Sequence, residues 1–164
     1  STVYLNRRER VDMKNLKKML SAIFILTCGF FTIGSNVNAQ TEKMESALTK
    51  EEKSEGTLEF QTKGQYLQEG QTIIVNAGKG KVNAGGKTTA QQVVNEVKIA
   101  VIIEQYNNGS WSQVYTWREA AYNDYVVSTS KTLEVPRGYY YRARGIHSAN
   151  TDVGNSFTNG IWMG

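Results

Sequence analysis

The feature that most constrains the fold is a strict two-residue alternation that follows a turn at 136–138. Over the next eight residues, aromatic, charged and small side chains alternate between two sides of the chain. One side holds Tyr139, Tyr141, Ala143 and Gly145, and the other holds Tyr140, Arg142, Arg144 and Ile146. A period of two with aromatic enrichment is typical of a half-buried β-strand. We therefore predict a strand with an inner face that packs and an outer face that meets solvent.

Short apolar runs separated by glycine and asparagine predict further strands. The clearest run covers 97–104, and the turn residues 107–109 after it predict a hairpin, because Asn and Gly tolerate positive φ. Other strands are expected around 58–66 and at 71–75, 81–84, 111–117, 126–133 and 156–163. No segment after residue 56 has a convincing helical period. The sequence thus predicts an all-β fold, an antiparallel β-sandwich of about seven strands.

Residues 80–88 come close to the pattern of a phosphate-binding loop, but the spacing differs. Five residues instead of four separate the first glycine from the Gly-Lys-Thr triplet, and no long apolar strand leads into the segment. We therefore expect a glycine-rich turn, in which Gly85 and Gly86 end the strand that begins at Lys81.

The leader at 1–39 has the three-part layout of a secretory signal peptide. A basic segment begins at Met13, an almost wholly apolar run covers 19–34, and Ala39 supplies a small residue at the cleavage position. We predict translation from Met13, export, cleavage after Ala39 and a mature chain without a permanent membrane span. Retention of the apolar run as an anchor is the alternative.

Cys28 is the only cysteine, and it lies inside this apolar run. Its neighbours do not suit a lipid-attachment signal, so we favour its removal with the leader over lipidation. The mature chain then contains no cysteine. This excludes disulfides, thiolate catalysis and thiolate metal sites from the mature protein.

The net charge of +4 belongs to the leader. Residues 1–39 hold six of the 19 basic and two of the 15 acidic side chains, so the remainder carries 13 of each. A neutral remainder offers no basic surface to a phosphate backbone, and we predict that nucleic acid is not a partner. Residues 40–56 contain five glutamates and only three apolar side chains. They predict a charged flexible linker before a domain at 57–164.

No segment carries a recognisable catalytic or metal-binding motif. His147 is the only histidine, which excludes multi-histidine metal sites. A serine–histidine–aspartate arrangement would need Ser148 or Ser156 with Asp124 or Asp152, and the nucleophile elbow is missing. The weaker options are a calcium site at 150–155 and a glycosidase pair drawn from Glu104, Glu119, Asp124 and Glu134. We predict no cofactor, no metal and no catalytic residue.

Aromatic residues are the better candidates for function. Exposed rings beside amides and hydroxyls suit sugar-binding β-domains, because a ring face stacks on the apolar face of a pyranose. Tyr140, Arg142 and Arg144 share the outer face of the predicted strand, where they can stack or pair with carboxylates. The candidate binding surface consists of Tyr140, Arg142, Arg144, Trp111, Tyr115 and Trp117.

The stretch from Leu133 resembles the corner before the penultimate strand of fibronectin type III and immunoglobulin-like sandwiches. Pro136 and Gly138 follow the leucine, and Tyr139 comes six residues after it. The resemblance implies an immunoglobulin-like sandwich in which the hydroxyl of Tyr139 bonds back to the upstream backbone.

Five further segments have a shared pattern, and they cover 108–111, 115–117, 128–131, 138–149 and 159–162. They resemble a group of small secreted proteins of Gram-positive bacteria, catalogued as a domain of unknown function. This resemblance implies secretion and a compact β domain, with no established activity or site.

Together these features predict a secreted, non-enzymatic binding module, extracellular or associated with the cell wall, whose partner is a glycan or another protein. The first alternative is a secreted bacteriocin-like effector, because short exported β-proteins with leader peptides include such agents. A small extracellular hydrolase is the third.

Overall fold

The computed structural model describes residues 46–58 and 64–164, which lie in one compact unit, Lys43–Gly164. The predicted leader 1–39, with the start at Met13 and the cleavage after Ala39, lies outside the described residues. Within the described ranges, no helix has the length and apolarity needed to cross a membrane.

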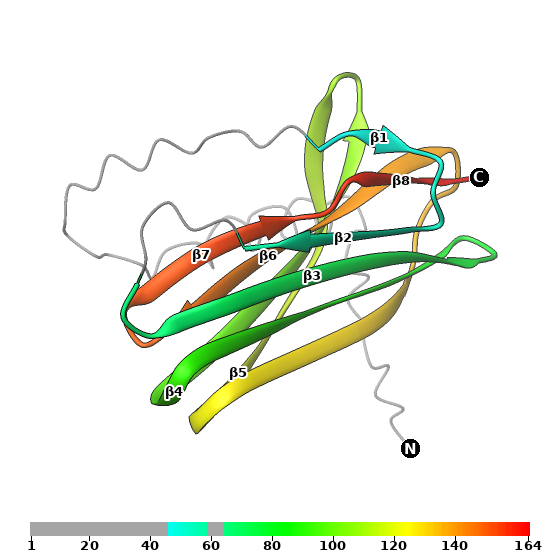
Figure 1. Cartoon of the computed structure of the whole chain (residues 1–164). Coiled ribbons are helices and arrows are strands. Elements are labelled where there is room, and N and C mark those ends of the chain that lie inside the picture. Colours follow the sequence, from blue (N-terminus) through cyan, green and yellow to red (C-terminus); the bar gives the residue numbers. More distant parts are fainter. Residues whose placement is uncertain (1–45, 59–63) are drawn as a thin grey trace, which may run out of the picture. The chain divides into compact units, whose positions relative to one another are not determined.

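The prediction of an all-β fold is confirmed over the described residues, which form eight strands in one sheet (Figure 1). The strands are β1 (Leu48–Thr49), β2 (Lys53–Thr57), β3 (Leu67–Gly78), β4 (Lys81–Asn107), β5 (Ser110–Glu134), β6 (Tyr139–Ala149), β7 (Asp152–Phe157) and β8 (Gly160–Met163). Their order is β1-β8-β6-β4-β3-β2, while β5 pairs with β4 and β7 with β6. The sheet is mixed, because β1 runs parallel to β8 and the other neighbours are antiparallel.

The long strands β4 and β5 run from one half of the sheet into the other. The first half of β4 pairs with β3 and the second half with β6, while β5 accompanies both halves on the opposite edge. The pairing of β4 with β5 shifts register between Thr89 and Val94, and Asn123 nearby on β5 has a φ of 52°. Because such a bulge increases bending and twist, the sheet curls strongly, like half of a barrel. The curl brings β3 against β6 and β7.

The predicted two-sheet sandwich of about seven strands is therefore wrong in its architecture. The structure is one curled sheet of eight strands. Gly85 and Gly86, predicted to end a strand, lie inside β4. A glycine pair weakens an isolated strand, but here β3 and β5 both pair with this segment and hold it extended.

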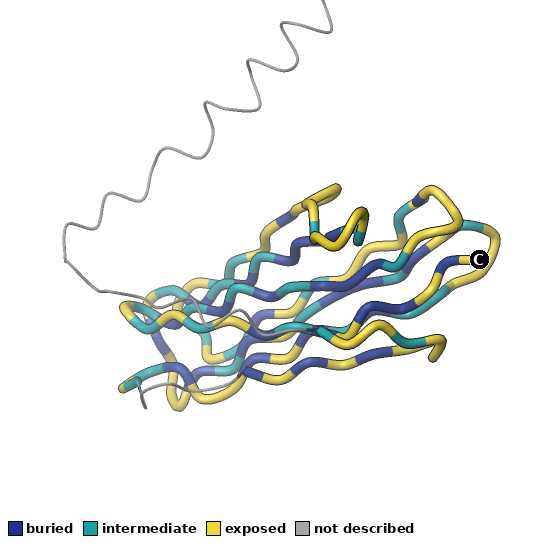
Figure 2. The backbone as a smooth tube through the Cα atoms, turned by 90° about the horizontal axis from the view of Figure 1, so that it is seen from above, coloured by how far each residue is buried: buried dark blue, intermediate teal, exposed yellow. Residues whose placement is uncertain are grey.

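The core lies between the inner faces of the two halves. Figure 2 shows buried and exposed positions alternating along the strands. In the second half of β4 the inner residues Val97, Ile99, Val101 and Ile103 are completely buried. Burying an aliphatic side chain of this size stabilises the fold by about 1.5–3 kcal/mol, so this strand anchors the core.

Two glycines allow the halves of the sheet to approach each other closely. A Cβ at Gly56 of β2 would collide with the carbonyl oxygen of Phe157 in β7. A Cβ at Gly145 of β6 would collide with the hydroxyl of Thr72 in β3. The backbone of β2 thus lies directly against β7, although these strands are not paired in the sheet.

The predicted charged linker 40–56 contains β1 and most of β2 in its described part. Along β2, Lys53 and Glu55 are exposed and lie 2.6 Å apart as an ion pair, while Ser54 and Gly56 are buried. Small residues at alternate positions let the strand pack despite its charges. The prediction of a linker is therefore wrong for these strands. It rests on the charged composition of the segment, whereas the alternation of buried and exposed residues is what makes β2 a strand.

Two other predicted strands differ from the structure. Leu58 and residues 64–66 are not in a strand, and the rest of the predicted strand 58–66 lies outside the described residues. The stretch predicted as one strand at 156–163 is divided between β7 and β8 at residues 158–159.

Candidate binding surface

Strand β6 alternates as predicted for most of its length. Tyr141, Ala143 and His147 point into the core and are buried. Tyr139, predicted to share this inner side, is exposed at the start of the strand. On the outer side, Tyr140 and Arg144 are partly exposed. They are the part of the predicted recognition row that solvent reaches.

Four aromatic residues lie in register across four adjacent strands on this outer face. Trp111 of β5 is paired with Tyr106 of β4, Tyr106 with Tyr140 of β6, and Tyr140 with Trp162 of β8. We call these four residues the aromatic row. The ring centroids of Tyr106 and Trp111 are 5.0 Å apart, and those of Tyr140 and Trp162 are 4.9 Å apart. Both pairs are tilted contacts, a favourable geometry for aromatic rings.

The aromatic row is partly open to solvent. Tyr106, Trp111 and Tyr140 are half-buried, and Trp162 keeps 38% of its surface exposed. Rings that are fixed by their neighbours and remain accessible lose little entropy when a ligand binds. The row is therefore a pre-formed aromatic surface.

Arg142, next to the aromatic row, is not the free recognition group that the alternation predicts. It is buried, its Nε donates to the Glu104 carboxylate at 2.6 Å, and one Nη donates to the Ser46 hydroxyl at 3.0 Å. Its guanidinium also stacks 4.5 Å from the Trp111 ring centroid. Glu104 on β4 and the Trp111 ring enclose the Arg142 side chain. Because its guanidinium stacks on the ring, Arg142 positions Trp111.

Arg144, two residues further along β6, keeps its charge available. It is partly exposed, its guanidinium lies 5.4 Å from the ring centroid of Phe157, and it forms no ion pair among the described residues. Its Nε is buried without a hydrogen-bond partner in that part of the chain. An uncompensated cation beside aromatic rings attracts anionic groups.

Trp117 and Tyr115 do not join this surface. They lie on the inner side of β5, where Trp117 is buried and its Nε1 donates to the Thr129 hydroxyl at 3.1 Å. The Tyr115 hydroxyl donates to the backbone carbonyl of Glu134 at 2.8 Å. Both link the two halves of β5 across its bend. Of the predicted surface, the structure brings together Tyr140, Arg142, Arg144 and Trp111.

The predicted tyrosine corner exists, but a different tyrosine forms it. The hydroxyl of Tyr141, not of Tyr139, donates to the carbonyl of Pro136 at 2.8 Å and accepts from the Gln105 amide at 2.9 Å. Burial raises the pKa of Tyr141 above its ordinary value of 10.0. Because Tyr141 is an inner residue, its hydroxyl ties the incoming turn to the core.

His147 lies inside the core, with a hydroxyl group at each of its two ring nitrogens. Nδ1 is 2.8 Å from Thr88 Oγ1 of β4, and Nε2 is 2.7 Å from Ser156 Oγ of β7. Ser156 in turn bonds to the Thr72 hydroxyl of β3. All four are buried, and we call them the hydroxyl–histidine cluster. Burial lowers the pKa of His147 to about 4, so the ring is neutral at pH 7.

The cluster resembles a nucleophile–base pair in its distances but not in its access. Ser156 and His147 both have 0% exposure, and Thr88 stands where a triad would place a carboxylate. Asp124 and Asp152 instead accept hydrogen bonds from backbone amides, Asp152 from Tyr66 at 2.5 Å. The cluster therefore serves to join the two halves of the sheet.

The loop at 150–155, weighed above as a weaker option for calcium, has a structural role in the described chain. The Asn150 side chain accepts from the Glu96 amide at 3.3 Å, and Asp152 holds the start of β3. Among residues 46–58 and 64–164 there is no group of three or more metal-ligating His, Cys, Asp or Glu side chains.

Tyr106 and Phe157 also belong to this surface, although the surface predicted from the sequence does not include them. The hairpin turn at 107–109 places Tyr106 opposite Trp111, a signal present in the sequence. The position of Phe157 beside Arg144 depends on the pairing of β6 with β7, which no local pattern specifies.

Comparison with protein-family models gives no match to the chain, and comparison with curated proteins gives none either.

Proposed function

We propose that the protein is a non-enzymatic binding module that recognises a glycan through the outer face of β6. The observation that supports this best is the aromatic row, four half-open rings held in register on adjacent strands. Secretion and attachment at the cell wall, in a small secreted family of Gram-positive bacteria, are part of the proposal and rest on the leader and the resemblance described above.

The chemistry of the surface suits a sugar with an acidic group. Aromatic faces stack on the apolar faces of pyranose rings, and adjacent strands lie about 4.8 Å apart, so the row extends over roughly 14 Å. That length accommodates more than one sugar ring. Arg144 supplies a positive charge that no described carboxylate neutralises. A carboxylate or phosphate on the glycan would pair with it.

A pull-down with purified cell-wall polysaccharide and with acidic and neutral oligosaccharide resins tests the proposal. The double variant Tyr140→Ala, Trp162→Ala should lose at least tenfold in retention, because both rings of one contact are removed. The single variant Arg144→Gln should weaken retention on acidic resins only.

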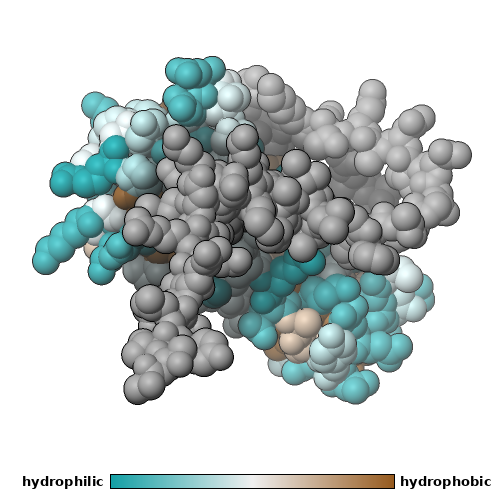
Figure 3. All heavy atoms as spheres, turned by 180° about the vertical axis from the view of Figure 1, so that it is seen from behind, coloured by the Kyte–Doolittle hydropathy of each residue, from teal (hydrophilic) through white to brown (hydrophobic). Residues whose placement is uncertain are grey.

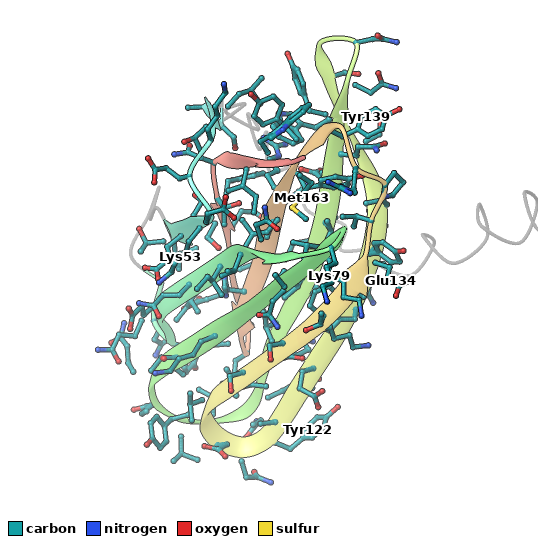
Figure 4. The ribbon with its side chains drawn as sticks, turned by 90° about the vertical axis from the view of Figure 1, so that its right-hand side faces the viewer. Lys53, Lys79, Tyr122, Glu134, Tyr139 and Met163 are labelled. Atoms are coloured by element: carbon teal, nitrogen blue, oxygen red, sulfur yellow. The ribbon has the colours of Figure 1, made fainter. Side chains whose placement is uncertain are left out.

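The matched control is Tyr122→Ala, Tyr125→Ala, which removes two exposed rings at the bend of β5. Figure 4 shows Tyr122 at the end of the unit opposite Tyr139 and Met163, the neighbours of the row. Equal retention of both double variants and the unsubstituted protein would refute the aromatic row as the binding surface.

A further inference from the structure

The strongest feature that the proposed function does not use is a groove on the other half of the sheet. Hydrophilic residues dominate the described surface that Figure 3 shows. The groove has a volume of about 460 Å³ and crosses β2, β3, β4 and β5. That volume lies within the range of small-ligand sites.

The register of the four strands explains the depression. Its floor is the backbone row Gly56, Thr72, Gly86 and Thr129, whose side chains, where present, point inward. The rows on either side form the walls. In one wall Gly85 has no side chain between Ile73 and Ser130. Gly85, the first of the two glycines that the sequence presents as a turn, therefore hollows the outer face.

Charged groups of opposite sign stand on the two walls. Lys87 of β4 is exposed and forms no ion pair within the described chain, and Ser128 lies directly opposite it on β5. Glu55 of β2 shares an exposed ion pair with Lys53. Exposed ion pairs of this kind contribute little to stability, so the Glu55 carboxylate can accept a second cation. Ile73 adds an apolar contact between the charges.

The separation of the two charges defines the size of the ligand. Glu55 and Lys87 are two strands and two residues apart in the register, which places their Cα atoms roughly 12 Å apart. Both side chains can lean into the groove and shorten the gap. A chain of two or three residues spans such a gap at about 3.3–3.6 Å per residue.

We propose that this groove binds a short zwitterionic peptide of two or three residues. Lys87, supported by the hydroxyls of Ser128 and Ser130, receives the terminal carboxylate. Glu55 receives the terminal ammonium group, and Ile73 contacts a small side chain. The site is separate from the aromatic row, because the outer faces of the two half-sheets point away from each other.

Calorimetric or NMR titration of the purified protein with alanyl-alanine at low ionic strength tests the proposal. Acetylating the amino end should weaken binding about two- to fivefold, and amidating the carboxyl end should do the same, as expected for exposed ion pairs. Lys87→Gln should weaken the binding of alanyl-alanine to the level of its amidated form. It should leave the binding of the amidated form unchanged.

The control variant Lys81→Gln removes an exposed lysine of the same strand, whose pair with Glu134 spans 3.8 Å, and should bind as the unsubstituted protein does. The proposal is overturned if alanyl-alanine does not bind, or if its capped forms bind equally well. It is also overturned if Lys87→Gln and Lys81→Gln bind alike. None of these results bears on the aromatic row, which the polysaccharide pull-down measures separately.

Discussion

At the scale of the residue, His147 shows how the core uses polar groups. Its ring contacts Thr88 on one half of the sheet and Ser156 on the other, with no exposed surface. Hydroxyls serve both nitrogens of a neutral ring, because each can donate or accept. Among the described residues no carboxylate contacts the ring, so none of these contacts stabilises its protonated form. A buried imidazolium would therefore be costly here.

The free energy of unfolding should consequently fall with pH below about 6.5. In the folded protein His147 has a pKa of about 4, against an ordinary value of 6.5. Between these values the unfolded chain binds a proton that the folded chain does not. The loss should reach about 1.4 kcal/mol per pH unit and total roughly 3 kcal/mol near pH 4, while the full stability is present above pH 6.5.

Urea titrations from pH 4 to pH 8 measure this slope. The variant His147→Gln can hydrogen-bond but cannot titrate, so its slope should be smaller by the contribution of His147. Carboxylates elsewhere affect both proteins equally. The same pH slope in both proteins would disprove the assignment.

At the scale of the element, the turn before β6 depends on one hydroxyl. Tyr141 connects Pro136 in the turn with Gln105 on β4, so it fixes where the strand enters the sheet. Tyr139 lies at the same edge and makes no such bond among the described contacts.

Tyr141→Phe should destabilise the protein by about 1–2 kcal/mol, because it leaves the part-buried Pro136 carbonyl and Gln105 amide without a partner. Tyr139→Phe should change stability by less than about 0.5 kcal/mol, as surface substitutions usually do. Chemical denaturation of the two variants compares them directly. A larger loss of stability in Tyr139→Phe than in Tyr141→Phe would contradict this, because it would show that Tyr139 forms the corner, as the sequence pattern indicates.

The strands that have local signals could be predicted from the sequence. Their assembly into one curled sheet could not. The alternation of β6, the hairpin at 107–109 and the central strand at 97–104 follow from period and turn chemistry. The continuation of β4 through Gly85 and Gly86 depends on partners far away in the chain.

The candidate surface was predictable to the same degree. Alternation places Tyr140 and Arg144 outside, and it also places Arg142 there. Only the register of β4 against β6 shows that Glu104 lies opposite Arg142 and withdraws it from recognition. Trp117 continues the alternation that begins at Trp111, but the register shift between Ile103 and Glu104 places it on the inner side of β5, where it is buried.

At the scale of the whole described unit, one curled sheet presents two outer faces of different chemistry. The half built on β6 and β8 carries the aromatic row and Arg144, while the half built on β2 and β3 carries the polar groove. The inner faces are committed to the core and to the hydroxyl–histidine cluster. The recognition that we propose therefore uses residues that the fold does not need.

The most direct test of this division is an amide NMR spectrum recorded while a uronate-containing hexasaccharide is added. We predict that shifts concentrate on the outer positions around Tyr106, Trp111, Tyr140, Arg144 and Trp162. The amides around Tyr122 and in the groove should stay unchanged. Saturable shifts confined to the bend or the groove, with the aromatic row unaffected, would contradict the account.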